Sequence, residues 1–214
     1  MIKAILFDMD GVVVDSEPLY MQAEIQLFRQ YGVEIPDDDW KLFRGCTEEA
    51  FYKISMERYG IQEEESTFRQ KGRALVFEEF SAHLKFMDGF FSLIEMVRKH
   101  FSTGLVTSSP GDVFEFVNDR VKLRKYFDQI IFGGMTKNGK PHPEPYLTVM
   151  KKLDVLPEEC VIIEDSIHGI NAGLASGAKV IALTGSVNPE DMPTPHRIVN
   201  SLSEITEKLI RQLG

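Results

Sequence analysis

Short apolar runs that alternate with helical patterns constrain this chain more than any other feature of its sequence. The runs are rich in Val, Ile and Leu, and their length and their Gly or Pro flanks favour strands over buried helices. They cover 2–7, 104–107, 129–132, 161–163 and 180–183, with a short sixth run at 198–199, and the predicted helices cover 91–100, 112–125, 144–153, 167–176 and 201–212. Buried strands separated by helices are typical of a parallel sheet that helices cover on both faces. The sequence therefore predicts an α/β fold with a doubly wound, Rossmann-like core.

One long segment interrupts this alternation. Between residues 16 and 86 helical patterns dominate, and amphipathic stretches cover 20–31, 48–59 and 64–80. We interpret 16–86 as a small helical cap domain inserted into a core made of 1–15 and 87–214. An insert that only packs on the core is the simpler alternative. The cap interpretation is favoured because the insert leaves the chain just after the first strand, where open α/β sheets bind ligands.

Charge and cysteine usage limit the partners of the chain. The formal net charge is -9, which repels phosphodiester backbones, so nucleic acid is not an expected partner. A phosphorylated ligand would be repelled as well, so a phosphate site requires local positive charge. The chain has two cysteines without metal-type spacing, which fits a reducing compartment. Acids interrupt its first apolar run, which argues against a signal peptide, and no run is long enough to span a bilayer. We therefore expect a cytoplasmic protein without membrane contact.

Acidic side chains follow two of the predicted strands. Asp8 and Asp10 come directly after the first strand, and Glu164 and Asp165 end the fourth. Buried acids are costly unless something neutralises them. A turn would explain Asp10, and capping of the next helix would explain Glu164 and Asp165. Neither explains Asp8.

A hydroxyl cluster and a lysine follow two other strands. Thr107 and Ser108 lead into a predicted helix, where hydroxyls suit either a simple N-cap or a phosphate site. Lys140 lies in a proline-rich loop that suits a lysine aimed at a fixed anion, although a solvated surface lysine is the simpler alternative. His142, between two prolines, is interpreted as a loop residue.

All four clusters lie at the carboxyl ends of parallel strands, so the fold brings them to one edge of the sheet. Acids from two strands can hold Mg²⁺, which favours a few carboxylates together with a substrate phosphate. A lysine and a hydroxyl can bind the remaining phosphate oxygens. This set of groups indicates phosphoryl transfer, in which positioning and charge neutralisation supply most of the catalysis.

These residues resemble the motifs of the haloacid dehalogenase superfamily of aspartate-nucleophile phosphohydrolases. The similarity covers the core in order and spacing: Asp8-Met9-Asp10-Gly11-Val12 with Asp15-Ser16-Glu17, then Ser108, Gly139-Lys140-Pro141, Glu164-Asp165-Ser166, Gly169, Ala172 and Ala175-Ser176-Gly177. The resemblance implies that Asp8 attacks phosphorus and forms an aspartyl-phosphate. It implies that Asp10 protonates the leaving oxygen and then deprotonates the attacking water.

The resemblance also implies the binding residues. Ser108 would hydrogen-bond the phosphate, with Thr107 as the alternative if the strand end lies one residue away. Lys140 would pair with the phosphate and with Asp8. Mg²⁺ would be held by Asp8, by the backbone carbonyl of Asp10 and by Asp165, and Glu164 would join them directly or through water.

The helical insert is similar to that of the β-phosphoglucomutase-like branch, which contains sugar-phosphate phosphatases and mutases. The mutases share a histidine and an arginine in the cap, where this chain has Tyr20 and Glu48. We therefore expect a phosphatase that acts on a small phosphorylated metabolite such as a sugar phosphate, with a phosphomutase as the alternative. Its specificity is expected to depend on cap loops that include 44–48.

Three other classes of protein fit less well. A receiver domain of a signalling relay would carry its phosphorylated aspartate on a middle strand and would lack the helical insert. A halide-releasing enzyme of the same superfamily needs neither Asp10 nor a metal site. A catalytically inactive scaffold would not need every catalytic residue type, and all of them are present here.

Overall fold

The computed structural model describes residues 1–43, 48–185 and 193–214, and the chain forms two compact units. The core unit contains 1–15 and 85–214, and the helical unit contains 16–84. The boundary that we expected after residue 86 therefore falls after Leu84. Phe86 belongs to the core unit because it forms an antiparallel bridge with Val14, and the neighbouring Met87 N–H donates to the Val13 carbonyl at 3.0 Å.

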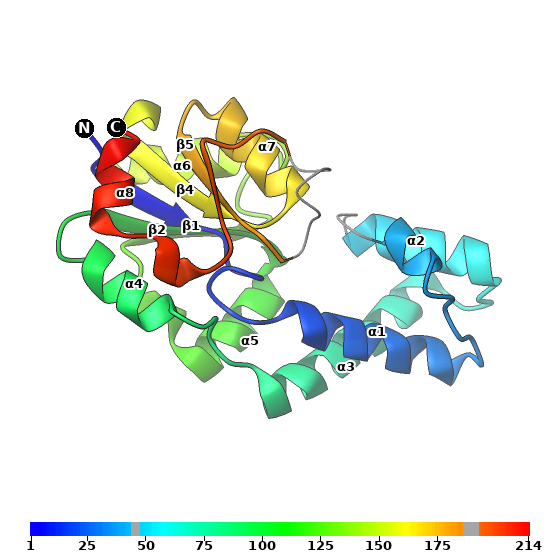
Figure 1. The fold of residues 1–214 in the computed structure, drawn as a ribbon. Coiled ribbons are helices and arrows are strands. Elements are labelled where there is room, and N and C mark those ends of the chain that lie inside the picture. The colour runs from blue at the N-terminus through cyan, green and yellow to red at the C-terminus, as the bar shows by residue number, and fades with distance from the viewer. Residues whose placement is uncertain (44–47, 186–192) are drawn as a thin grey trace. The chain divides into compact units, whose positions relative to one another are not determined.

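Six parallel strands form the sheet of the core unit in the order β3-β2-β1-β4-β5-β6 (Figure 1). Their bounds are β1 Ala4–Phe7, β2 Ser102–Pro110, β3 Gln129–Gly133, β4 Cys160–Glu164, β5 Lys179–Leu183 and β6 Arg197–Val199. The chain winds outward from β1 to β3 and then crosses back to β4, so the winding reverses between β1 and β4. This confirms the predicted doubly wound α/β fold. Ligand sites in such sheets lie at the carboxyl ends of the strands that flank the reversal.

Helices cover both faces of this sheet (Figure 1). They are α4 Phe90–Val97, α5 Gly111–Val121, α6 Glu144–Leu153, α7 Ile167–Ala175 and α8 Glu207–Gln212. Right-handed crossovers place α4 and α5 on one face and α6 and α7 on the other. Side chains alternate along each strand, so Ala4 and Leu6 of β1 join the hydrophobic core beneath α6 and α7. Phe7 points to the opposite face, where its ring packs edge-on against Phe127.

Several element boundaries differ from those expected, among them α4, which ends at Val97 instead of residue 100. β2 continues beyond residue 107 to Pro110, with a shift in its register against β3. The helix expected over 112–125 ends at Val121, because Lys122 has a φ of 57° and a 3₁₀ turn over Leu123–Lys125 follows. The helix expected over 201–212 is a 3₁₀ turn over Leu202–Glu204 followed by α8. The Thr206 side chain caps α8 by accepting a hydrogen bond from the Leu209 N–H.

The helical unit is built from α1 Glu17–Gln30, α2 Glu48–Tyr59 and α3 Glu65–His83, with a 3₁₀ turn over Asp39–Leu42. Its centre is aromatic. The buried ring of Phe28 lies 5.3 Å from Tyr59, 6.0 Å from Phe43 and Phe51, and 6.4 Å from Phe68, measured between ring centroids. Phe28 therefore connects all three helices of this unit with Phe43, the residue that follows its 3₁₀ turn.

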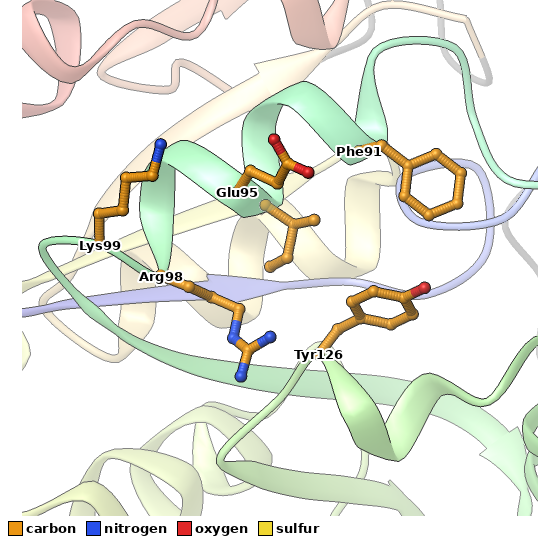
Figure 2. Close-up of a pocket in the computed structure, with 6 residues that line it drawn as sticks. Phe91, Glu95, Arg98, Lys99 and Tyr126 are labelled. Atoms are coloured by element: carbon orange, nitrogen blue, oxygen red, sulfur yellow. The ribbon is translucent and has the colours of Figure 1, made fainter.

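A surface hollow of about 430 Å³ lies beside α4 in the core unit (Figure 2). Its lining is aromatic and charged, and consists of Phe91, Ile94, Glu95, Arg98, Lys99 and Tyr126. None of these residues follows the carboxyl end of β1 or β4, so the hollow is separate from the point where the winding reverses. Among the described residues, no helix combines the length and the apolar character that a membrane crossing requires.

Replacing Phe28 by alanine is expected to destabilise the helical unit by about 3–5 kcal/mol, because it leaves a cavity among four rings. Urea unfolding followed by circular dichroism measures the loss. Phe91→Ala is the matched control, because Phe91 is 51% exposed. Equal free energies of unfolding for the two variants would contradict the role assigned to Phe28.

Candidate active site

Three buried carboxylates meet at the carboxyl ends of β1 and β4. Phe7 of β1 pairs with Ile163 of β4, and the Asp8 N–H donates to the Ile163 carbonyl at 3.0 Å, which places Asp8 beside Glu164. Asp8, Glu164 and Asp165 are 7%, 0% and 3% exposed, and each offers an oxygen within 4.8 Å of the others. The sheet register thus brings together acids from the first and fourth strands.

Lys140 supplies the positive charge of this cluster. Its side chain is buried, and Nζ donates to Asp8 Oδ1 at 2.5 Å, to Glu164 Oε1 at 2.5 Å and to the Val106 carbonyl at 3.0 Å. These three bonds account for all three protons of the ammonium. The loop before Lys140 is held by Glu144 of α6, whose carboxylate accepts hydrogen bonds from the backbone N–H groups of Lys137 and Asn138.

The charges of the cluster shift the pKa values of its members. Burial raises the pKa of Asp8 well above its usual range; Lys140 opposes this rise, whereas Glu164 adds to it. Burial alone would lower the pKa of Lys140, but the charges of Asp8 and Glu164 outweigh it and raise that pKa. The lysine therefore stays charged at neutral pH. A divalent cation bound by the three buried acids would add positive charge to that of Lys140.

Both oxygens of the Glu164 carboxylate accept hydrogen bonds. Its Oε1 accepts from Lys140 and from the Tyr146 hydroxyl at 2.6 Å. Its Oε2 accepts from the backbone N–H groups of Asp165 and Ser166 and from the Ser166 hydroxyl. The first turn of α7 packs directly on this carboxylate, since a Cβ at Gly169 would lie only 1.8–2.1 Å from its atoms.

Two hydroxyls hold Asp10. Ser109 Oγ donates to Asp10 Oδ2 at 2.7 Å and Thr107 Oγ1 donates to the same oxygen at 3.3 Å, while the Ser109 N–H donates to Thr107 Oγ1. Because β2 extends to Pro110, side chains alternate through this segment. Thr107 and Ser109 therefore share a side, and the intervening Ser108 is exposed. The structure brings the alternative hydroxyl, Thr107, to the acids.

The sequence reasoning missed two polar residues at this site. Ser109 is not among the candidate residues drawn from the sequence, and Tyr146 enters only as part of the helix expected over 144–153. Ser109 could have been found from its two-residue spacing to Thr107, had the strand been extended past its apolar run. The sequence carries no comparable signal for Tyr146, which occupies an apolar position of α6.

The residues expected to set specificity belong to the helical unit. Residues 44–47 lie outside the described part of the chain. Glu48 begins α2, where its carboxylate accepts a hydrogen bond from Arg73 and lies 3.8 Å from Arg69. Lys71, another cation of the helical unit, pairs with Glu63 and donates to the Tyr31 hydroxyl.

With this geometry established, comparison with known proteins places the chain. The family described as haloacid dehalogenase-like hydrolases matches residues 5–183, which include every residue of the acidic cluster. The chain belongs to this family. The resemblance seen in the sequence and the expectation of a hydrolase are thereby confirmed.

Similar proteins match this haloacid dehalogenase-like hydrolase over nearly its whole length. A phosphorylated carbohydrates phosphatase of Thermotoga maritima is 34% identical over 215 residues, which cover 95% of this chain and 99% of that protein. Hexitol phosphatase B of Escherichia coli K12 is 30% identical over 218 residues, which cover 97% and 96%. The crystal structure of a HAD hydrolase, family IA, variant 3, from Entamoeba histolytica has a TM-score of 0.87 at 25% identity and covers 99% of both chains.

Adding a methyl group at Gly169 is expected to displace the Glu164 carboxylate. Gly169→Ala should lower the free energy of unfolding by about 1–3 kcal/mol, the usual cost of overpacking a buried site. Urea unfolding measures the change. Gly139→Ala is the control, because a Cβ at Gly139 meets no atom within 4 Å. If both variants unfold like the wild type, Glu164 is not packed against α7 as described.

Proposed function

We propose that this protein is a Mg²⁺-dependent phosphatase that hydrolyses a small phosphorylated carbohydrate through an aspartyl-phosphate on Asp8. The observation that carries the proposal is the buried Lys140 ammonium, which bridges Asp8 and Glu164 at the carboxyl edge of the sheet. The names of the Thermotoga maritima and Escherichia coli relatives support phosphorylated carbohydrates as the substrate class. The cytoplasmic location stays a prediction, since it rests on the sequence alone.

Asp8 is suited to the role of nucleophile. Lys140 fixes one of its oxygens, which orients the carboxylate and offsets its charge as a phosphate approaches. In the first step, a carboxylate oxygen forms a bond to phosphorus and the bond from phosphorus to the leaving oxygen breaks. In the second step, water attacks the aspartyl-phosphate, which frees the Asp8 carboxylate and releases inorganic phosphate.

Asp10 handles the proton in both steps. Protonated Asp10 gives its proton to the leaving oxygen, and the resulting carboxylate then takes a proton from the attacking water. The hydroxyls of Ser109 and Thr107 converge on Oδ2, so this oxygen is held in place between the steps. The same carboxyl group is thus regenerated at the end of each turnover.

The donor set fits Mg²⁺. We assign Asp8, Asp165 and the Asp10 backbone carbonyl to the ion, because oxygen ligands and a few carboxylates suit this metal. When bound, Mg²⁺ supplies positive charge that offsets the charge of the transferring phosphoryl group. Glu164, the fourth predicted ligand, is assigned to Lys140 instead, because both of its oxygens already accept hydrogen bonds from neighbouring donors.

Phosphate release from a panel of sugar and sugar-alcohol phosphates tests the proposed function. The wild type should release phosphate with Mg²⁺ but not with EDTA, and Asp8→Asn should lower kcat by about 10³-fold or more because it removes the nucleophile. The exposed Asp119 of α5 offers the matched control, Asp119→Asn, which should keep wild-type activity. Substantial turnover by Asp8→Asn, or by the wild type in EDTA, would overturn the mechanism.

The products distinguish a phosphatase from the alternative phosphomutase. A mutase must bind a second phosphate group, and Glu48 stands where the mutases have an arginine and pairs with Arg73. With β-glucose 1-phosphate and a trace of the 1,6-bisphosphate, we expect inorganic phosphate as the product. Formation of glucose 6-phosphate in excess of phosphate would favour the mutase.

The hydroxyl that binds the transferring phosphate is assigned to Thr107, whose single proton turns from Asp10 Oδ2 to the phosphate while Ser109 still donates to Asp10. Thr107→Val keeps the shape of the side chain and removes the donor, and should lower kcat/KM by roughly 10–100-fold, as for a lost bond to a charged group. Ser108→Ala alters an exposed side chain and should have little effect. The reverse order of effects would restore Ser108 as the phosphate ligand.

A further inference from the structure

Tyr146 is a polar residue within a hydrophobic cluster of the core unit. It is fully buried, and it lies on the face of α6 that packs on the sheet together with Val149 and Met150. A phenylalanine would fill the same space without a polar atom. Burying a hydroxyl is costly unless it finds a partner, and here the partner is charged, since the hydroxyl donates to Glu164 Oε1 at 2.6 Å.

The tyrosine contacts both ions of the buried pair. Its hydroxyl touches the Glu164 carboxylate, and the Lys140 Nζ lies 5.0 Å from the centre of its ring. A cation over a ring face is attracted by the ring quadrupole. The hydroxyl and the ammonium also converge on the same oxygen, Oε1, at 2.6 and 2.5 Å.

The two oxygens of Glu164 have different surroundings. Oε2 is bound by donors of the segment that begins α7, namely the N–H groups of Asp165 and Ser166 and the Ser166 hydroxyl. Oε1 receives Lys140, and in the described part of the chain Tyr146 is the other donor to it. Without the Tyr146 hydroxyl, Glu164 Oε1 would keep Lys140 as its donor and would attract the ammonium more strongly.

Lys140 is shared between two acids, Glu164 and Asp8, at equal distances of 2.5 Å. A stronger pull from Glu164 would draw the ammonium away from Asp8. We propose that Tyr146 is a positioning residue whose hydroxyl satisfies part of the Glu164 charge and so leaves Lys140 on the nucleophile Asp8. The inference rests on the proposed function, in which Lys140 orients Asp8.

The variant Tyr146→Phe isolates the hydroxyl, because the ring and its contact with Lys140 remain. We expect kcat to fall by about 10-fold, the effect of one hydrogen bond to a charged group, with KM nearly unchanged, because Tyr146 does not touch the substrate. Tyr126→Phe is the matched control, since it removes the same atom from a half-buried tyrosine of the hollow beside α4 (Figure 2). It should retain the wild-type kcat. A wild-type kcat for Tyr146→Phe would overturn the proposal.

A double-mutant cycle with Glu164→Gln separates positioning from general stability. The neutral amide removes the charge that competes for Lys140, so Tyr146→Phe should change kcat by less than about 2-fold in that background. A simple structural role would give the same loss in both backgrounds, and that result would contradict the proposal.

A crystal structure of Tyr146→Phe tests the same idea without any assay. Lys140 Nζ should have moved beyond hydrogen-bonding distance of Asp8 while keeping its bond to Glu164; an unmoved lysine would overturn the proposal. This outcome is independent of the proposed function, which fails instead if the wild type shows no phosphate release that depends on Asp8.

Discussion

The buried ammonium of Lys140 is the interaction on which the site depends. It lies between carboxylates from two strands and a carbonyl from a third, so it ties β1, β2 and β4 together where the winding of the sheet reverses. An ion pair at this depth is costly to dehydrate, and only complete hydrogen bonding offsets that cost. Because folding has already removed water from the lysine, a phosphate that enters meets a charge that needs no further dehydration.

The chain as a whole is acidic, with a formal charge of -9, so local positive charge at the site is needed to attract a phosphate. Among the residues that the structure describes, Lys140 brings this charge to the acids, and the hydroxyls of Thr107 and Ser109 lie beside Asp10. The acids therefore do two different tasks. Asp8 and Asp165 are the acids that we assign to the cation in the proposed function, whereas Glu164 is enclosed by donors and binds Lys140.

The sequence predicted the sheet, the insert and the edge at which the polar clusters meet, because those features follow from apolar periodicity and strand direction. It did not decide between Thr107 and Ser108, since that choice depends on how far β2 continues beyond its apolar run. The sequence does not predict the contact of Tyr146 for another reason. On a buried helical face a tyrosine follows the same pattern as a phenylalanine, and only the packing of α6 against β4 shows what its hydroxyl meets.

The bare Cα of Gly169 lets the amino-terminal end of α7 approach the Glu164 carboxylate. A helix carries a partial positive charge at this end, equivalent to about half an elementary charge. Glu164 is thus neutralised by the helix dipole as well as by Lys140. Because the helix end offsets part of the Glu164 charge, more of the Lys140 charge is left for Asp8.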